Sequence, residues 1–330
     1  MTDQMHLFGA PPPPTKGPPE GVVTDEDRAL AAALPDWLRL GTSSWSFQGW
    51  EGIVYDRKAS PQVLSRQGLR AYAQNPLFRT VGVDRAHYQP LTVEQWRHHA
   101  DQVPADFRFL VKAHEWCTLA RFPSHARYGA RADQDNGFFL DPLYARDEVI
   151  GPTVEGLADK LGVLLFQFAA QDLRRVGGPD GFCDALYAFL SALPVGPTYA
   201  VEVRNARLLT PRFADALAAS GAMPCLARVG DLPDLREQAR RTPFGIAPVG
   251  VLRWMLKRGH TYDTAARAYA PFSELRDPDP ATREVLASLV AQLPRPTFVI
   301  MNNKAEGCSP ESIRAFARRL VEMFHVEQPS

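Results

Sequence analysis

The sequence predicts an α/β protein built around a (β/α)8 TIM-like barrel in a single domain. Its 330 residues are 45% hydrophobic and 22% charged, a composition typical of a globular protein with a large buried core. Short apolar runs recur along the chain, and longer amphipathic stretches separate them. Strands that alternate with helices form parallel sheets covered on both faces, so such strands are apolar throughout. About eight of these runs are present, which is the number that closes a barrel.

The predicted elements follow one another in a regular order. Strands are expected at 38–43, 78–84, 107–113, 162–168, 198–203, 222–227, 249–255 and 296–301. Helices are expected between them, at 63–74, 92–102, 182–193 and 211–220. The helix at 92–102 begins with Thr92 and Gln95, which have the spacing of a capping box. A doubly wound open sheet is the alternative, but the chain has no GxGxxG turn after an early strand and no GxxxxGK[ST] loop.

The barrel domain is expected over 38–324, between two tails. Residues 1–37 are interpreted as a Pro-rich tail and lead-in, mostly disordered over 1–23, because clustered prolines favour extended, solvated backbone. A PxxP-type docking role for this tail is the second interpretation. Residues 325–330 are expected to form a short C-terminal tail. The 117–149 segment after the third strand is long for a connection and is expected to form a lid-like insertion.

Charge and cysteine usage exclude several classes of protein. The chain has 37 Lys and Arg against 37 Asp and Glu, so it lacks the basic excess of a protein that coats nucleic acid. Its four cysteines are far apart, without CxxC spacing, which fits a reducing compartment. No run approaches the roughly 20 apolar residues of a membrane helix, and the N-terminus does not resemble a signal peptide. A cytoplasmic protein with no membrane partner is expected.

Polar side chains gather at the carboxyl ends of the predicted strands, where barrel enzymes build their sites. Side chains two residues apart share one face of a strand, so several of these residues continue apolar rows. They are Lys112, His114, Gln167, Glu202, Arg204, Arg253, Asn302 and Asn303, with Asp84 and Tyr88 after the second strand. Because buried charges are rare unless paired, the charged members need one another, water or a ligand. A polar rim that satisfies itself is the alternative.

The cations of this set are predicted to clamp a phosphate or carboxylate group. Lys112, Arg204 and Arg253 would hold the anion, and Glu202 would transfer a proton. Lys112 is the second catalytic candidate, because burial and neighbouring cations lower the pKa of a lysine and make it a base or a Schiff-base nucleophile. A simple ion pair between Lys112 and Glu202 is the competing interpretation.

The other candidates are expected to bind or cover the substrate. Gln167, Asn302 and Asn303 would orient hydroxyl groups, and Asp84 is a second carboxylate at the mouth. Trp45, Trp50 and Tyr88 lie on expected mouth loops, where they would stack on a sugar or base or fold into a cover of their own. No metal site and no cofactor are predicted, since most strand ends offer Lys, Arg, Gln or Asn; His114 and Asp84 would be the best ligands if a metal bound.

Five motifs in order resemble the YecE-like family, also called domain of unknown function 72. They are GTSSWSFQGWEGIVY at 41–55, FRFLVKA at 107–113, GVLLFQF at 162–168, YAVEVR at 199–204, and Asn302-Asn303 with Gly307 and Pro310. The resemblance implies a single TIM-like barrel, and it implies no particular reaction. The chain departs from typical members at Gly82 and Asp84, where they carry Glu and Asn, and at Met255, where many carry His. These departures indicate a divergent subfamily.

The resulting hypothesis is a metal-independent acid/base enzyme, a hydrolase or an isomerase/lyase, acting on a small anionic, sugar-like or phosphorylated ligand. One alternative is a nucleic-acid-processing barrel related to metal-dependent endonucleases. The insertion mixes arginines and aromatics, which suits a phosphate backbone, but its four aspartates favour a lid over a small ligand. The other alternative is a non-catalytic ligand-binding protein.

Overall fold

Eight parallel strands close into a barrel in the computed structural model, which describes residues 17–292 and 294–326. Each strand pairs with the next along the chain, and β8 pairs with β1. The strands are β1 (Leu38–Thr42), β2 (Phe78–Val83), β3 (Arg108–Lys112), β4 (Leu161–Phe168), β5 (Tyr199–Val203), β6 (Met223–Arg228), β7 (Gly250–Trp254) and β8 (Thr297–Met301). The predicted barrel is confirmed, and each predicted strand end lies within one residue of the observed end.

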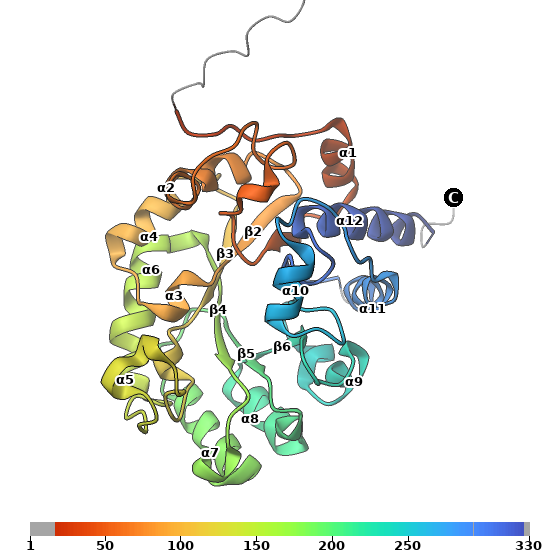
Figure 1. The fold of residues 1–330 in the computed structure, drawn as a ribbon. Helices are drawn as coiled ribbons and strands as arrows, with labels where there is room; N and C mark the ends of the chain where they lie inside the picture. The colour runs from red at the N-terminus through yellow and green to blue at the C-terminus, as the bar shows by residue number, and fades with distance from the viewer. Residues whose placement is uncertain (1–16, 293, 327–330) are drawn as a thin grey trace, which may run out of the picture.

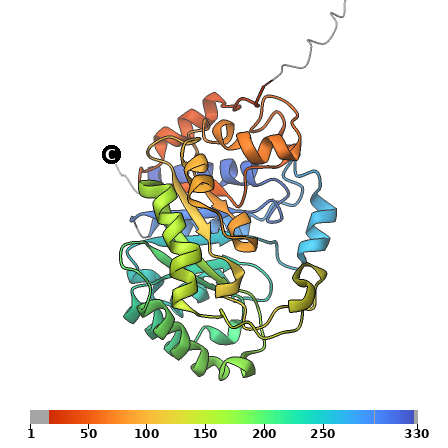
Figure 2. The ribbon, with the colours of Figure 1, turned by 90° about the vertical axis from the view of Figure 1, so that its left-hand side faces the viewer.

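Helices surround the barrel (Figures 1 and 2). They are α1 (Asp25–Ala33), α2 (Pro61–Tyr72), α3 (Arg85–Tyr88), α4 (Val93–Ala100), α5 (Pro142–Tyr144), α6 (Gly151–Leu157), α7 (Gly178–Ser191), α8 (Pro211–Ser220), α9 (Leu235–Arg240), α10 (Tyr262–Tyr269), α11 (Pro280–Ala291) and α12 (Ser309–Val326). The four predicted helices correspond to α2, α4, α7 and α8. Thr92 and Gln95 form the predicted capping box at the start of α4, with reciprocal bonds of 3.3 and 3.0 Å.

The barrel interior is filled by alternate residues of the strands. Its apolar cluster contains Leu110, Val163, Leu165, Ala200, Met223, Cys225, Val251, Phe298 and Ile300. Side chains from six different strands can contact one another in this way only inside the barrel. The period of two therefore directs Lys112, Gln167, Glu202, Arg253 and Asn302 inward as well. Val111, one residue before Lys112, packs instead in the core beneath the helices.

Close approach of the first two strands requires glycine at one position. The pairing of β1 with β2 shifts register between Leu40 and Gly41. A Cβ atom on Gly41 would lie 2.0 Å from the carbonyl oxygen of Thr80, a distance that no side chain tolerates. Gly41 therefore allows the barrel to close tightly where the predicted first motif begins.

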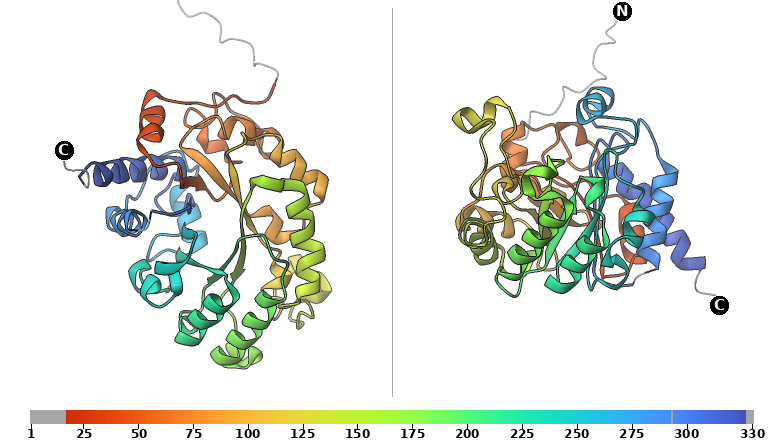
Figure 3. Two further views of the ribbon diagram at one scale, coloured as in Figure 1. Left: turned by 180° about the vertical axis from the view of Figure 1, so that it is seen from behind. Right: turned by 90° about the horizontal axis from the view of Figure 1, so that it is seen from below.

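The two ends of the described chain pack together, which corrects part of the predicted tails. Residues 17–23 are not disordered: Val22 N donates to Val54 O at 2.9 Å, and Gly21 forms a bridge with Tyr55. Helix α1 lies beside α12 (Figures 1 and 3), and His325 belongs to α12 instead of a tail. The rest of the predicted tails, residues 1–16 and 327–330, lies outside the described residues.

The segment between β3 and β4 contains several short helical turns. They are η2 (Glu115–Cys117), η3 (Ala126–Arg131), α5 and the π-helical turn η4 (Ala145–Ile150), followed by α6. Figure 2 shows α5 and α10 projecting from the same end of the barrel. Across the part of the chain that is described, no helix has both the length and the hydrophobicity needed to span a membrane.

Candidate functional site

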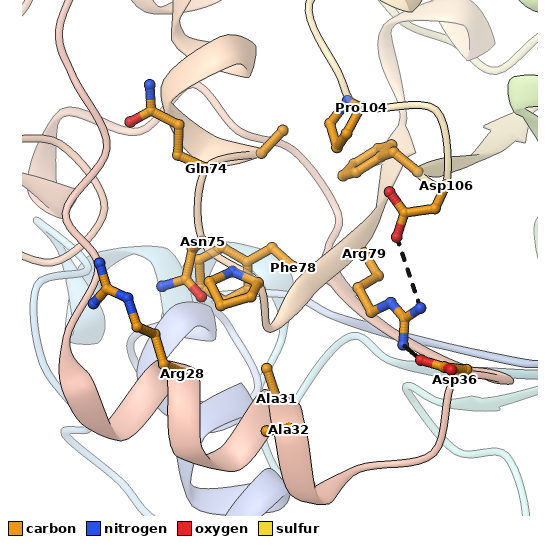
Figure 4. Close-up of a pocket in the computed structure, with 13 residues that line it drawn as sticks. Arg28, Ala31, Ala32, Asp36, Gln74, Asn75, Phe78, Arg79, Pro104 and Asp106 are labelled. Atoms are coloured by element: carbon orange, nitrogen blue, oxygen red, sulfur yellow. Dashed lines mark hydrogen bonds and ion pairs between the residues drawn. The ribbon is translucent and has the colours of Figure 1, made fainter.

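Cavities open at both ends of the barrel, and their polar groups differ. At the amino ends of β2 and β3, a cavity of about 500 Å³ contains Arg79 between two carboxylates, 3.3 Å from Asp36 and 3.7 Å from Asp106 (Figure 4). Arg28, the other charged lining residue, lies 3.7 Å from Asp25, so each charge of this cavity has a partner. In barrel enzymes this end supports stability, whereas the opposite end carries the chemistry.

The opposite end holds a cavity of about 300 Å³, called the mouth cavity below. Six of the predicted site residues line it, one from the end of each of six strands: Asp84, Lys112, Gln167, Arg204, Arg253 and Asn302. Tyr88, from the turn after β2, also lines it. Barrel closure therefore brings together side chains that are as much as 218 positions apart in the sequence, from Asp84 to Asn302.

One carboxylate pairs with two arginines, Arg204 just after β5 and Arg253 in β7. Glu202 accepts from Arg253 Nη1 at 2.5 Å and from Arg204 Nε at 3.0 Å, and its side chain is completely buried. Burial opposes the ionisation of Glu202, but Arg253 and Arg204 outweigh it and lower the pKa of Glu202 to about 2. Glu202 is therefore a permanent counter-ion.

This arrangement corrects the expected role of Glu202. We expected the carboxylate to face the ligand and transfer a proton. Arg204 and Arg253 line the mouth cavity, whereas Glu202 is not part of its lining and both of its oxygens are engaged. A group with so low a pKa is a weak base at neutral pH. Two other carboxylates line the cavity: Asp84, 3.6 Å from Arg253 Nη2, and Glu115, whose Oε2 accepts from Arg127 and Tyr128.

Lys112 and Gln167 line the mouth cavity with side chains that are nearly buried. Lys112 is 7% exposed and Gln167 is 3% exposed. Neither side chain makes a hydrogen bond or a close ion pair with any residue in 17–292 or 294–326. Burial lowers the pKa of Lys112 to about 8, although Asp84 acts in the opposite direction. The predicted Lys112–Glu202 ion pair does not form.

The insertion after β3 supplies one wall of the mouth cavity. Leu119, Pro123, Arg127 and Tyr128 belong to that wall. Arg127 Nη2 donates to Glu115 Oε2 at 2.7 Å, and the Tyr128 hydroxyl donates to the same oxygen at 3.1 Å. The Arg127 guanidinium also lies 5.0 Å from the centre of the Tyr88 ring. These contacts tie the insertion to the barrel beside the cavity.

The barrel fold agrees with comparisons of this sequence and structure with known proteins. The sequence model described as "Protein of unknown function DUF72" matches residues 39–330. The chain belongs to the DUF72 family. The predicted YecE-like resemblance is thereby confirmed, since that is the same family. A search of curated proteins found no match.

Solved structures of two DUF72 proteins have the same fold. A DUF72 family protein from Thermotoga maritima MSB8 is 19% identical, covers 86% of this chain and 98% of its own, and superposes with a TM-score of 0.55. A DUF72 family protein from Enterococcus faecalis V583 is 16% identical over 86% of this chain and 97% of its own, with a TM-score of 0.53. At this identity the likeness shows the fold alone.

Besides Glu202, four predicted site residues of this DUF72 protein do not line the mouth cavity. Trp45 and Trp50 are buried in the main core, where Trp45 Nε1 donates to Leu64 O at 3.1 Å. This is the self-folded cover that was the alternative for these rings. His114 turns toward the insertion, with Nδ1 2.7 Å from the Tyr144 hydroxyl. Asn303 accepts from Ser309 N and Oγ at 2.8 Å each and so caps α12.

Sequence reasoning missed several lining residues that lie outside the strands. His87, on the turn α3, has Nδ1 3.0 Å from Ala113 O, so Nδ1 carries the proton and Nε2 remains an acceptor. Burial lowers the pKa of His87 to about 2, with a smaller effect from Lys112, which keeps the ring neutral. Tyr262 begins α10, and its ring centre lies 5.8 Å from Arg204 Cζ. The alternation of side chains along a strand, which located the other site residues, does not apply to these short helical segments.

Clusters of metal-ligand type are absent from the described residues. No group of three or more His, Cys, Asp or Glu side chains in 17–292 and 294–326 is arranged to hold a metal ion. The His114 and Asp84 side chains, the best predicted ligands, face different cavities.

Proposed function

We propose that this DUF72 protein is an enzyme that binds a small anionic, phosphorylated or sugar-like ligand in the mouth cavity and acts on it by acid/base chemistry. The observation that carries the proposal is Lys112, a buried cation that lines a cavity without an ion pair, while each arginine of the same lining has a carboxylate partner. A buried charge without a partner is costly, so an anionic ligand supplies what this site lacks.

The lining residues divide into binding and reacting groups. Lys112 holds the anionic group, and the free amide of Gln167 binds a hydroxyl or phosphate oxygen. Arg204 and Arg253 also line the cavity, and Glu202 balances one of their two positive charges. Asp84 is assigned the proton transfer, because it is a carboxylate on the cavity wall whose one ion pair, with Arg253, is as long as 3.6 Å. The same set suits a hydrolase, an isomerase or a lyase.

Calorimetric titration with ribose 5-phosphate and with inorganic phosphate tests the proposal. We expect Lys112→Met to weaken ribose 5-phosphate binding by about tenfold or more, because a charge-assisted hydrogen bond is lost. Lys58→Met, at an exposed lysine without a hydrogen bond to any described residue, is the matched control and should bind as the wild type does. Equal affinities in the wild type and Lys112→Met would remove the basis of the proposal.

The lowered pKa of Lys112 favours a second candidate, a Schiff-base enzyme. A lysine with a pKa of about 8 is partly neutral near pH 7.5 and can attack a carbonyl carbon. Its Nζ forms the C=N bond, and the carbonyl oxygen leaves as water. Treatment with borohydride and small keto acids or ketoses should then add the reduced ligand mass to the peptide that contains Lys112. An unmodified peptide across the whole panel would count against this chemistry.

A further inference from the structure

An aromatic cleft of about 720 Å³ lies next to the mouth cavity. Five of its lining residues are rings: Tyr88, His114, Trp116, Tyr128 and Tyr144. Its charged lining residues are Arg127, Arg131, Glu115 and Glu148, so its charges balance. The mouth cavity is different, because it carries a cation without an ion pair. The two spaces therefore suit different parts of a ligand, one neutral and one anionic.

Three of the five rings of the cleft, His114, Trp116 and Tyr144, contact one another with planes inclined by 24–36°. The planes of Trp116 and Tyr144 differ by 24°, and those of His114 and Trp116 by 30°, with centroids 5.9 and 5.2 Å apart. The Arg131 guanidinium lies 4.8 Å from the centre of the Trp116 ring. Burial lowers the pKa of His114 to about 4, so its ring is neutral at physiological pH. A wall of rings and guanidinium groups is a surface on which a flat group stacks.

The cleft and the mouth cavity share part of their walls. Tyr88, Glu115, Arg127 and Tyr128 line both. Tyr88 is 58% exposed, so its ring remains available to a ligand in spite of the Arg127 contact on it. These shared residues place the cationic space and the aromatic space side by side.

We infer that the substrate is a nucleoside monophosphate or a molecule of that class, with its phosphate at Lys112 and its planar base in the aromatic cleft. This inference deepens the proposed function and rests on it, since it assigns the anionic end to the same cavity. Glu115 and Glu148 provide acceptors for the N–H groups of a base. The cavity volumes of about 300 and 720 Å³ lie within the usual range for ligand sites, roughly 300–1,000 Å³.

The test compares the four ribonucleoside 5′-monophosphates with ribose 5-phosphate, which has the same anionic end and no base. We expect at least one nucleotide to bind roughly fivefold to a hundredfold more tightly than ribose 5-phosphate, the range for stacking of one base on aromatic side chains. Trp116→Leu should remove most of this gain and leave the affinity for ribose 5-phosphate within about twofold. Lys112→Met should weaken both ligands together.

Two further variants keep the test decisive if Trp116→Leu unfolds, since Trp116 also stacks on Phe138. Tyr88→Leu removes an exposed ring and should reduce the nucleotide gain, whereas Tyr88→Phe retains the ring and should restore it. Tyr187→Leu, at a 45% exposed tyrosine on α7, is the matched control and should change neither affinity.

The possible results separate this inference from the proposed function. If every nucleotide binds as ribose 5-phosphate does, and Lys112→Met weakens all of them, the base subsite is wrong and the anion site stands. If Lys112→Met leaves all affinities unchanged, the proposed function fails, and the assignment of the phosphate fails with it.

Discussion

Two buried ionic clusters of this protein differ in how completely they are satisfied. In the first, Asp27 on α1 accepts from Arg314 Nε and Nη2 on α12 at 2.7 and 3.0 Å, and from Asn75 Nδ2 at 2.9 Å. In the second, Glu202 binds Arg204 and Arg253, but Lys112 nearby has no hydrogen bond or close ion pair with any described residue. Asp27 is buried in the fold, whereas Lys112 faces a cavity.

The difference indicates which cluster serves stability and which serves binding. Folding alone favours the complete pairing seen around Asp27, because each unpaired buried charge costs free energy. In the second cluster, at the mouth cavity, Glu202 pairs with both arginines, but Lys112 remains a buried charge without a close ion pair, which costs free energy. An incompletely satisfied cluster in a cavity is expected where a ligand completes it. The predictions below test this contrast, from the largest expected effect to the smallest.

Glu202→Gln should have the largest effect on stability. It leaves Arg253 and Arg204 buried without their shared counter-ion, and we expect a loss of about 3–5 kcal/mol in the free energy of unfolding. Urea denaturation measures it. Glu155→Gln, which breaks the exposed 2.7 Å pair with Arg97, is the control and should cost less than about 1 kcal/mol. Similar losses in the two variants would mean that the mouth cluster is not a buried ionic unit.

Asp27→Asn should destabilise the protein without affecting ligand binding. The amide keeps the shape of the carboxylate but leaves Arg314 with Glu311 as its one remaining close counter-ion, so we expect a loss of about 2–3 kcal/mol. Calorimetric titration with ribose 5-phosphate should give the wild-type affinity at a temperature where the variant is folded. A tenfold change in that affinity would contradict the separation of the two clusters.

Lys112→Met should stabilise the ligand-free protein by about 1–2 kcal/mol at pH 7, because it removes an unpaired buried charge. The folded-state pKa of about 8 lies below the ordinary value of 10.5. Between these values the unfolded chain binds more protons, so wild-type stability rises with pH and the advantage of Lys112→Met shrinks. Urea denaturation of both proteins at pH 7 and near pH 10 measures this. If the stability of Lys112→Met relative to the wild type increased between pH 7 and pH 10, the lowered pKa of Lys112 would be contradicted.

The affinity for ribose 5-phosphate should fall as the pH rises above about 8. Lys112 binds the anion in its charged form, so each further pH unit should weaken binding by up to about tenfold. The bound anion raises the pKa of Lys112, which moves the fall to somewhat higher pH. Lys112→Arg should flatten the profile, since an arginine stays charged throughout. A wild-type profile as flat as that of the arginine variant would exclude Lys112 as the anchor.

Much of the barrel could be predicted because each strand has its own local signature. The apolar runs gave the strand positions, and the period of two placed Lys112, Gln167 and Arg253 on one kind of face. Which residues are neutralised could not be predicted, because it depends on distances across the barrel. Glu202 and Asp84 are both carboxylates at strand ends, yet only Asp84 lines the mouth cavity.

The turns and the insertion were beyond the sequence patterns. His87 and Tyr262 reach the mouth cavity from short helical segments whose direction depends on tertiary packing. The insertion was identified by its length, but its contact with the barrel depends on Arg127 meeting Glu115 and Tyr88. Conversely, Trp45 looked like a ligand-stacking ring because it lies in a loop after β1, and the loop packs inward to bury it.

The central claim is that Lys112 is a buried ammonium group that has no close ion pair with a described residue until a ligand binds. Its protonation can be followed by NMR of the lysine side chains, with Lys112→Met identifying the resonance. We predict that Lys112 titrates near pH 8 in phosphate-free buffer and moves to higher pH when ribose 5-phosphate is added. Titration near pH 10.5 that does not respond to ribose 5-phosphate would contradict the account.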